Sequence, residues 1–343
     1  MPLEIDGSYG EGGGQILRTA LALSSITGKS IYIKNIRKGR KTPGLLQQHL
    51  TCIKAAGQAT NARVKGAEFR SEELYFEPQS PRPGSYSFDV AEERGSAGAT
   101  SLVLQAIMPI LVYASHSSTV RIRGGTHTEW SPPFHYLQEV LAPMLSKLGI
   151  KISLALKRWG FYPRGGGEIE VKIQPCRDIK GINVTSAGTL KSIRGVSVVS
   201  SLPISIAERQ KLQAITRLRD FSPQIEVVRV LAQSPGTFFF IVGDFENVSA
   251  GFSSLGKPGK PAEKVADEAC DNFLNYYESK KALDKHLADQ IILYLALAKT
   301  RSVFTTSCVS QHLLTNVWVI KKFLDRLISV KGALGEPGEV EVH

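Results

Sequence analysis

One pattern of apolar periodicity occurs three times in the sequence, at intervals much longer than a single helix or strand. The three copies align on strand-like segments that begin at Ile31, Val120 and Val303. Each segment follows a long apolar stretch with helical periodicity. A second amphipathic helix is expected thirteen residues after each starting point, from Gly44, Pro133 and Asn316. Two further strands follow in the first two copies, and a weaker pair follows in the third. This repeat predicts an α+β fold of three tandem strand–helix–strand–helix–strand–strand (βαβαββ) units.

The spacing of the copies predicts an insertion between the second and the third. Ile31 and Val120 lie 89 residues apart, whereas Val120 and Val303 lie 183 residues apart. The excess of 94 residues is the size of a small domain. We place this small α+β domain at residues 182–275, where further helix and strand patterns occur. Residues 1–181 and 276–343 are then expected to form the three-unit part.

One position of the repeat carries a different polar residue in each copy. Nine residues after each starting point lie Arg40, Glu129 and His312, a variation that a purely structural repeat does not require. His312 is expected in the junction between a strand at 302–306 and a helix that begins near Asn316. Such junctions commonly present chemical groups, and a helix N-terminus favours anions. His312 is therefore a candidate catalytic residue.

Residues 6–18 hold five glycines between a short strand and a helix. Such a loop lets backbone N–H groups approach a phosphate, although a tight turn alone also explains the glycines. The segment is neither a Walker A nor a G-x-G-x-x-G motif. Glu11 is the carboxylate among the glycines and suits a divalent ion with oxygen ligands. Arg18 follows one to two helical turns later and can reach the same anion.

Residues 36–44 form a second candidate anion site, because four cations occupy five consecutive positions. This loop is equivalent to the one that carries His312, which favours anion binding by Arg37 and Arg40. Gln48, one turn into the next helix, can donate to the same ligand. The alternative is a solvated run of charges.

The second copy contributes weaker candidates. Gln105 lies on its first helix, and Pro132 belongs to a Pro-Pro pair that offers a flat face to a base or signals a helix start. His127 is expected to be a surface histidine. The glycine-rich turn at 160–167, beside Arg164, is either a further backbone approach to phosphate or a simple hairpin.

A near match to a Walker A motif lies within the expected insertion, at residues 251–258. Pro258 stands where Ser or Thr should bind Mg²⁺, which counts against a phosphate loop. Phe252 of this segment is a candidate nucleotide contact.

Composition restricts the class of protein. The formal net charge of +11 fits either a basic surface or a polyanionic partner. No apolar run reaches the roughly 20 residues of a membrane helix, and the first residues do not resemble a signal peptide, so no membrane partner is expected. The four cysteines lie far apart without a C-x-x-C pair. We therefore expect reduced thiols and a cytoplasmic location.

Several separate motifs occur in the order found in the RNA 3′-terminal phosphate cyclases, and the chain resembles this family from end to end. The motifs are Asp6-Gly with Glu11-Gly-Gly-Gly-Gln-Ile-Leu-Arg18, Arg37-Lys-Gly-Arg40-Lys-Thr-Pro-Gly-Leu-Leu-Gln-Gln48-His-Leu, Gly95-Ser-Ala-Gly98, Gly160-Phe-Tyr-Pro-Arg-Gly-Gly-Gly167, Leu287-Ala-Asp289-Gln and His312-Leu-Leu-Thr-Asn316. The resemblance implies three units similar to the C-terminal domain of translation initiation factor three, with a small inserted domain.

The resemblance also implies an ATP-dependent reaction in three steps. A histidine that matches His312 attacks the α-phosphate of ATP and forms enzyme–AMP. AMP then passes to an RNA 3′-phosphate, and the vicinal 2′-OH displaces it to leave a 2′,3′-cyclic phosphate. Glu11 is expected to hold Mg²⁺ or Mn²⁺. The residues expected to contact ATP or phosphate are Arg18, Arg37, Arg40, Gln48, Gln105, Pro132, Phe252, Asp289 and Asn316.

One residue departs from the family pattern, one histidine has no assigned role, and two alternative functions stay open. Trp159 stands where a basic residue is expected, and His286 receives no role. One alternative is a non-catalytic RNA-binding ribosome-assembly factor on the same scaffold, although such relatives lack the histidine. The other is a transferase of enolpyruvyl groups, which would carry no adenylylated residue. The oligomeric state stays open, a homo-oligomer included.

Overall fold

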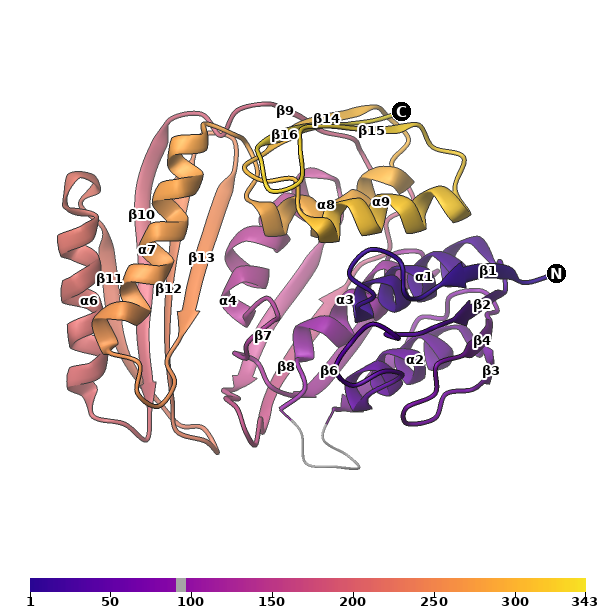
Figure 1. Ribbon diagram of the computed structural model, residues 1–343, viewed down its shortest axis with the longest axis horizontal. Coiled ribbons are helices and arrows are strands. Elements are labelled where there is room, and N and C mark those ends of the chain that lie inside the picture. Colours follow the sequence, from indigo (N-terminus) through magenta and orange to yellow (C-terminus); the bar gives the residue numbers. More distant parts are fainter. Residues whose placement is uncertain (91–96) are drawn as a thin grey trace.

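The computed structural model describes residues 1–90 and 97–343 and confirms the α+β class. Gly95 and Ser96, which belong to one of the family motifs, lie outside the described residues. Four sheets of four strands each occur in the described part of the chain. Figure 1 shows three of these sheets around a central group of helices, with the fourth sheet and its two helices at the left.

The first sheet has the strand order β1-β2-β4-β3, in which β1 and β2 are parallel and the other neighbours antiparallel. The elements of this unit are β1 (Leu3–Asp6), α1 (Gly14–Thr27), β2 (Ile31–Lys34), α2 (Gln47–Thr60), β3 (Arg63–Lys65) and β4 (Leu74–Glu77).

The second sheet has the order β5-β6-β8-β7, again with one parallel pair at its β5 edge. Its elements are β5 (Ser85–Asp89), α3 (Thr100–Val112), β6 (Ser118–Gly124), α4 (Phe134–Tyr136), the π-helical segment η1 (Leu137–Leu141), α5 (Ala142–Lys147), β7 (Ile152–Arg158) and β8 (Gly167–Ile173).

The third sheet has the order β9-β14-β16-β15, with β9 and β14 parallel. Its elements are β9 (Asn183–Val184), α8 (Lys285–Leu297), β14 (Ser302–Thr306), α9 (Gln311–Phe323), β15 (Ile328–Lys331) and β16 (Gly338–Val342). The three sheets therefore share one strand order and one set of strand directions.

The fourth sheet, of order β11-β10-β12-β13, is built from a continuous stretch of chain between β9 and α8. We call this part the fourth-sheet unit. It contains β10 (Leu190–Ser200), α6 (Ile204–Arg217), the short 3₁₀ helix η2 (Arg219–Phe221), β11 (Gln224–Val230), β12 (Gly236–Phe245), β13 (Ser249–Leu255) and α7 (Ala262–Ser279). Strand β13, which was not predicted, occupies most of the near-Walker A segment.

The helices of the first three units pack against one another and form the core between the sheets (Figure 1). α3 is buried on nearly all sides, as expected for a helix that is apolar all round. α1 contacts α2, α3 and α9, and α8 contacts α9. This arrangement brings the N-terminal ends of α1 and α9 together. None of the helices that the structure describes is both long and apolar enough to cross a bilayer.

Two helices begin at positions different from those predicted. α9 starts at Gln311 rather than near Asn316, because Ser310 caps it: the Ser310 Oγ accepts a hydrogen bond from the Leu313 N–H at 3.0 Å. His312 therefore lies in the first turn of a helix and not in the preceding loop. Gly44 has a φ of 75°, which a helix cannot contain, and α2 starts only at Gln47.

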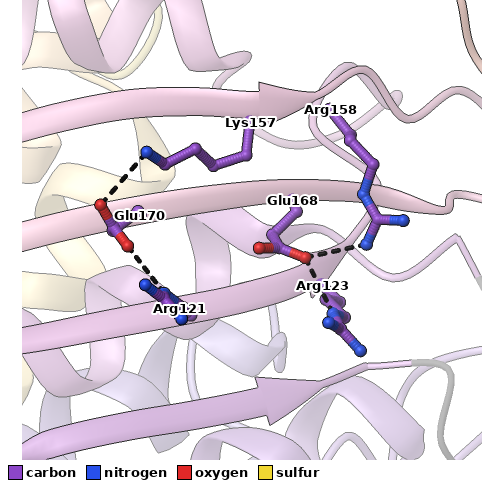
Figure 2. A network of polar contacts seen from close by, with 6 residues as sticks. All are labelled: Arg121, Arg123, Lys157, Arg158, Glu168 and Glu170. Carbon is purple, nitrogen blue, oxygen red and sulfur yellow. Dashed lines mark hydrogen bonds and ion pairs between the residues drawn. The ribbon is translucent and has the colours of Figure 1, made fainter.

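Charged side chains cover the outer face of the second sheet, as Figure 2 shows. Inward residues of β6 such as Val120 and Ile122 are buried, while the alternate residues face solvent. Each of two glutamates on β8 pairs with one cation from β6 and one from β7. The pairs are Glu170 with Arg121 (2.7 Å) and Lys157 (3.3 Å), and Glu168 with Arg123 and Arg158 (both 2.8 Å). Because cations outnumber carboxylates in this network, part of the positive surplus of the chain lies here.

A pair of histidines joins the second unit to the fourth-sheet unit. His127 was expected on the surface, but its residue is only 1% exposed. Its Nε2 lies 2.9 Å from His135 Nδ1, and its Nδ1 lies 2.8 Å from Thr126 Oγ1. Thr126 Oγ1 accepts the Gly160 N–H, so its own hydrogen can point to His127. Both rings are then neutral, and His127 donates to His135.

Aromatic rings enclose this histidine pair. Trp159 stacks on His127 with ring centroids 4.2 Å apart, and Phe238 of β12 meets the same ring edge-on at 4.5 Å. Burial lowers the pKa of His127 well below its ordinary value and lowers the pKa of His135 to about 4. The glycine-rich turn at 160–167 also faces this interface, because the Arg164 N–H donates to Ser234 Oγ at 3.1 Å.

Candidate active site

The glycine-rich segment before α1 crosses the N-terminal end of α9. Gly10 and Gly12 have φ angles of 58° and 55°, which favour glycine. A Cβ on Gly10 would lie 2.7 Å from Thr315 Oγ1, so the loop approaches α9 this closely only because the residue has no side chain. The close approach carries Glu11 to His312.

His312, Glu11 and Arg40 form the centre of the candidate site. His312 Nε2 lies 3.1 Å from Glu11 Oε2, and the same carboxylate oxygen lies 3.5 Å from Arg40 Nη2. The side chains of His312, Glu11 and Arg40 are 45%, 32% and 43% exposed, so all three are open to a ligand. The structure thus brings together three predicted residues from three separate segments of the chain.

The surroundings of His312 favour a neutral imidazole. Burial lowers its pKa, the Glu11 carboxylate opposes that shift, and the positive charges of Arg18 and Arg40 act with burial. Its position in the first turn of α9 acts in the same direction, because the positive end of the helix dipole disfavours a second positive charge. A neutral ring retains a nitrogen lone pair, which a nucleophile requires.

Asn316 links three helices below the cluster. Its Oδ1 accepts hydrogen bonds from Gln15 Nε2 (2.8 Å) and Thr19 Oγ1 (2.7 Å) of α1, and its Nδ2 donates to the Asp289 carbonyl of α8 (2.8 Å). Asn316 is 2% exposed. The residue was expected to contact ATP or phosphate, and here its amide is hydrogen-bonded to protein groups that hold α9 against α1 and α8.

Arg18 and Asp289 line a small cavity of about 30 Å³ beside this link. Arg18 is 7% exposed and donates from Nη2 to Gln15 Oε1 at 2.6 Å, but its Nε has no hydrogen-bond partner among the described residues. Burial lowers the pKa of Arg18 and raises the pKa of Asp289 well above its ordinary value. A buried guanidinium with an unused donor is suited to an anion.

Three of the predicted phosphate contacts form hydrogen bonds with the loop and the helices around the site. These residues are Arg37, Gln48 and Gln105. Arg37 Nη1 donates to the carbonyls of Thr42 (2.7 Å) and Gly44 (2.8 Å), so this arginine shapes its own loop. Gln48 Oε1 accepts the N–H of the residue that caps α3, Ala99, at 3.0 Å. Gln105 Nε2 donates to the side chain of the α8 residue Gln290 at 3.2 Å.

Phe252 and Pro132 are the two remaining predicted nucleotide contacts. Phe252 is 8% exposed on β13, and its ring packs against Phe273 and Tyr276 of α7 at centroid distances of 5.9 and 5.5 Å. It therefore belongs to the aromatic core of the fourth-sheet unit. Pro132 is partly exposed and directly precedes Pro133, the residue that caps α4.

The N-terminal end of α8 faces the same region. Asp284 Oδ1 caps this helix by accepting from the N–H groups of His286 (2.9 Å) and Leu287 (3.0 Å), and it also accepts from the Tyr136 hydroxyl (2.9 Å). Burial raises the pKa of Asp284 to about 6. His286 is exposed, with its ring edge-on to Tyr136 at 6.4 Å.

His49, which was not among the predicted site residues, lies beneath the glycine-rich loop. His49 is 7% exposed, and its Nδ1 accepts the Leu46 N–H at 3.0 Å. A Cβ on Gly14 would lie 2.5 Å from His49 Nε2, so the start of α1 rests directly on this ring. Burial, followed by the charges of Arg37 and Arg18, lowers its pKa to about 3. Its place in the motif directly after Gln48 was the available signal.

Comparison with known proteins identifies the family. The sequence model of the RNA 3′-terminal phosphate cyclases matches residues 9–330. The chain belongs to the RNA 3′-terminal phosphate cyclase family. Relatives of that name include one from Gloeothece citriformis, 42% identical over 96% of this chain and 98% of its own, and one from Methylococcus capsulatus, 43% identical over 99% and 96%. A relative from Pyrococcus furiosus is 41% identical over 98% of both chains.

The residues at this cyclase-family site can hold a metal ion only if a bound substrate supplies further ligands. No group of three or more His, Cys, Asp or Glu residues is positioned to hold a metal within the part of the chain that the structure describes. Glu11 nevertheless supplies a carboxylate at the centre of the cluster. Mg²⁺ commonly takes one or two carboxylates together with water and phosphate oxygens. Glu11 is therefore sufficient for an ion that arrives with a nucleotide.

Proposed function

We propose that this protein uses ATP to convert an RNA 3′-terminal phosphate into a 2′,3′-cyclic phosphodiester, with His312 as the residue that carries AMP. The observation that carries the proposal is the cluster in which one carboxylate, Glu11, contacts both a half-exposed histidine with a lowered pKa and an arginine. Membership of the cyclase family supports the choice of substrate.

The chemistry divides one difficult displacement into three easier ones. An imidazole nitrogen of His312 forms a bond to the α-phosphorus of ATP, and pyrophosphate leaves. A 3′-phosphate oxygen of the RNA then attacks this phosphorus, and the bond to His312 breaks. Finally the 2′-oxygen attacks the 3′-phosphorus, loses its proton to solvent, and AMP leaves. The last step is intramolecular, which contributes on the order of 7–11 kcal/mol.

The protein contributes positive charge and position. Arg40 lies beside Glu11 and His312, where phosphate charge develops, and Arg18 offers its unused donor below them. Glu11 would hold Mg²⁺ or Mn²⁺, which supplies charge neutralisation to the phosphates when bound. Asn316 and Arg37 keep α9 and the basic loop in place through their hydrogen bonds.

The architecture is part of the same proposal. The three sheets of one strand order represent three copies of a βαβαββ unit similar to the C-terminal domain of translation initiation factor three. The fourth-sheet unit is the small inserted domain, and its boundary lies beyond β9, since this strand pairs with β14. We also place the protein in the cytoplasm, which the four free cysteines support.

The test is adenylylation without RNA. The protein is incubated with Mg²⁺ or Mn²⁺ and ATP labelled in the α-phosphate, denatured, and digested. Label is expected on the peptide that contains His312, lost in acid and stable in alkali, as for a phosphoramidate. In His312→Asn the label should fall by at least about 10³-fold, because the nucleophile is gone.

Matched controls separate the nucleophile from a general effect of histidine replacement. His286→Asn, at the neighbouring helix end, should retain labelling, since we assign this residue no covalent role. RNA ending in 3′-phosphate should give cyclic product, whereas 2′-deoxy-3′-phosphate ends should not. Label that persists in His312→Asn would identify another nucleophile, and no label with either metal would favour the RNA-binding assembly factor.

A further inference from the structure

An aromatic pair lies on the surface next to the His312 cluster. The rings of Tyr9 and Trp318 are stacked with centroids 4.0 Å apart and an angle of 7° between their planes. Tyr9 remains 41% exposed, and Trp318 is partly exposed. Other residues of α9, such as Leu313, Ile320 and Phe323, form its buried face. Trp318 packs against this core on its buried side, and Tyr9 extends the aromatic surface outward from it.

Two lysines extend this aromatic surface along α9. Lys322 Nζ lies 5.3 Å from the centre of the Trp318 ring, and Lys321 is its exposed neighbour in the last helical turn. Neither lysine forms an ion pair with any residue that the structure describes. Their positive charges are thus available to an anionic partner, and we call Tyr9, Trp318, Lys321 and Lys322 the α9 strip.

The α9 strip is linked to the candidate active site through Tyr9. Tyr9 precedes by two residues Glu11, whose carboxylate lies 3.1 Å from His312 Nε2. Trp318 follows His312 by six residues in the same helix, which corresponds to roughly 9 Å along the axis. At about 3.4 Å for each stacked nucleotide, this length holds roughly three of them.

We propose that the α9 strip binds the RNA strand on the 5′ side of the nucleotide that reacts. The proposal rests on the proposed function, because it names the path by which that RNA approaches His312. Bases stack on the exposed aromatic surface, and the lysines contact backbone phosphates. Aromatic platforms flanked by cations bind single strands with little dependence on sequence. Such a surface suits an enzyme that must recognise an RNA end and not a particular sequence.

The test measures RNA binding and adenylylation separately. Binding of a fluorescent ten-nucleotide RNA with a 3′-phosphate is followed by anisotropy over a range of salt, without ATP. In Lys321→Gln/Lys322→Gln the Kd should rise roughly tenfold, and the slope of log Kd against log salt should fall by about 1.4, as for two lost phosphate contacts to a single strand. The control Lys257→Gln/Lys264→Gln, on exposed lysines of the fourth-sheet unit, should leave both quantities unchanged.

A second variant tests stacking. Trp318→Leu should raise the Kd of the ten-nucleotide RNA by roughly tenfold or more, as expected when one stacked base loses its platform. A dinucleotide with the same 3′-phosphate, too short to cover the strip, should be cyclised with a KM changed much less. RNA-independent labelling of His312 should stay within about twofold in the lysine variant.

The outcomes that overturn the proposal differ from those that overturn the function. An unchanged Kd and salt slope in the lysine variant would exclude the strip as an RNA site. Slow labelling of Trp318→Leu with normal RNA binding would do so as well, since the stack would then only secure the glycine-rich loop. Failure of the unmodified protein to label His312 or to cyclise RNA would contradict the proposed function, whatever the binding data show.

Discussion

The molecule contains two histidine clusters that differ in exposure and in the groups around the rings. His312 is half-exposed at a helix N-terminus and contacts the Glu11 carboxylate, which also contacts the Arg40 guanidinium. His127 and His135 lie between the second unit and the fourth-sheet unit, hydrogen-bonded to each other and enclosed by Trp159 and Phe238. Burial lowers the pKa in both clusters. A depressed histidine pKa therefore does not by itself identify a catalytic group.

What separates the clusters is the use of the ring nitrogens. Both nitrogens of His127 have protein partners, Thr126 on one side and His135 on the other, so nothing remains for a ligand. Within the part of the chain that the structure describes, His312 has a protein partner at only one nitrogen, where Nε2 meets the Glu11 carboxylate, and Arg40 adds a positive charge beside it. We infer that the first cluster stabilises a domain interface, whereas the second performs chemistry. Each prediction below tests this division.

The largest effect is expected at the arginine of the open cluster. Arg40→Ala removes one electrostatic stabiliser of phosphate charge, and adenylylation should slow by about 10²-fold. Unfolding in urea should change by no more than about 0.5 kcal/mol, because the Arg40 side chain is 43% exposed. Single-turnover labelling and denaturation curves of the same preparation provide both values.

Arg37→Ala is the matched comparison within the same loop. Arg37 donates to two loop carbonyls, so its loss should lower stability by about 1 kcal/mol for the hydrogen bonds and slow adenylylation through loop disorder. The pattern of charges in this loop does not distinguish the two arginines, whereas their contacts do. Equal stability of the Arg37 and Arg40 variants would contradict the assigned roles.

The opposite pattern is expected at the closed cluster. His127→Leu leaves the hydrogen of the Thr126 hydroxyl and the Nδ1 of His135 without partners in a buried interface, which costs about 1–3 kcal/mol of the free energy of unfolding. Labelling of His312 should remain within a few-fold at a temperature where the variant is folded. A stable variant that no longer labels would show that the closed cluster also serves the chemistry.

Periodicity and spacing predicted most of the fold. The helices now seen as α1, α3 and α8 were expected from apolar periodicity, and the 94-residue excess led to the region of the fourth-sheet unit. Strand β13 was missed because Gly251 and three serines weaken its pattern, and its pairing with β12 supplies what local propensity lacks. The start of α9 was misplaced because the Ser310 cap was overlooked.

The candidate site was predictable only in part, because several of its contacts join residues that are distant in sequence. Glu11, Arg40 and His312 stood out by charge within their loops, and the structure brings them together. The buried place of His127 depends on Phe238, which is distant in sequence, so local composition wrongly suggested a surface histidine. His49 was missed because its role follows from the closeness of Gly14, a contact that neither sequence segment reveals alone.

The last prediction concerns the dependence of stability on pH, and it sharpens the comparison between the clusters. An unfolded histidine has a pKa near 6.5, whereas burial lowers the pKa of His135 to about 4 and that of His127 further. As the pH falls below about 6.5, protons therefore bind the unfolded chain first, and stability falls by up to about 1.4 kcal/mol per pH unit for each such residue. Above that pH the full stability is present.

Urea denaturation from pH 7.5 to 4.5 measures this dependence. The free energy of unfolding should change less steeply with pH in His127→Leu than in the unmodified protein, because the variant lacks one such group. His49 contributes equally in the two proteins. His312→Asn should change the slope less, because the His312 side chain is 45% exposed. A larger change in His312→Asn than in His127→Leu would reverse the assignment of the two clusters.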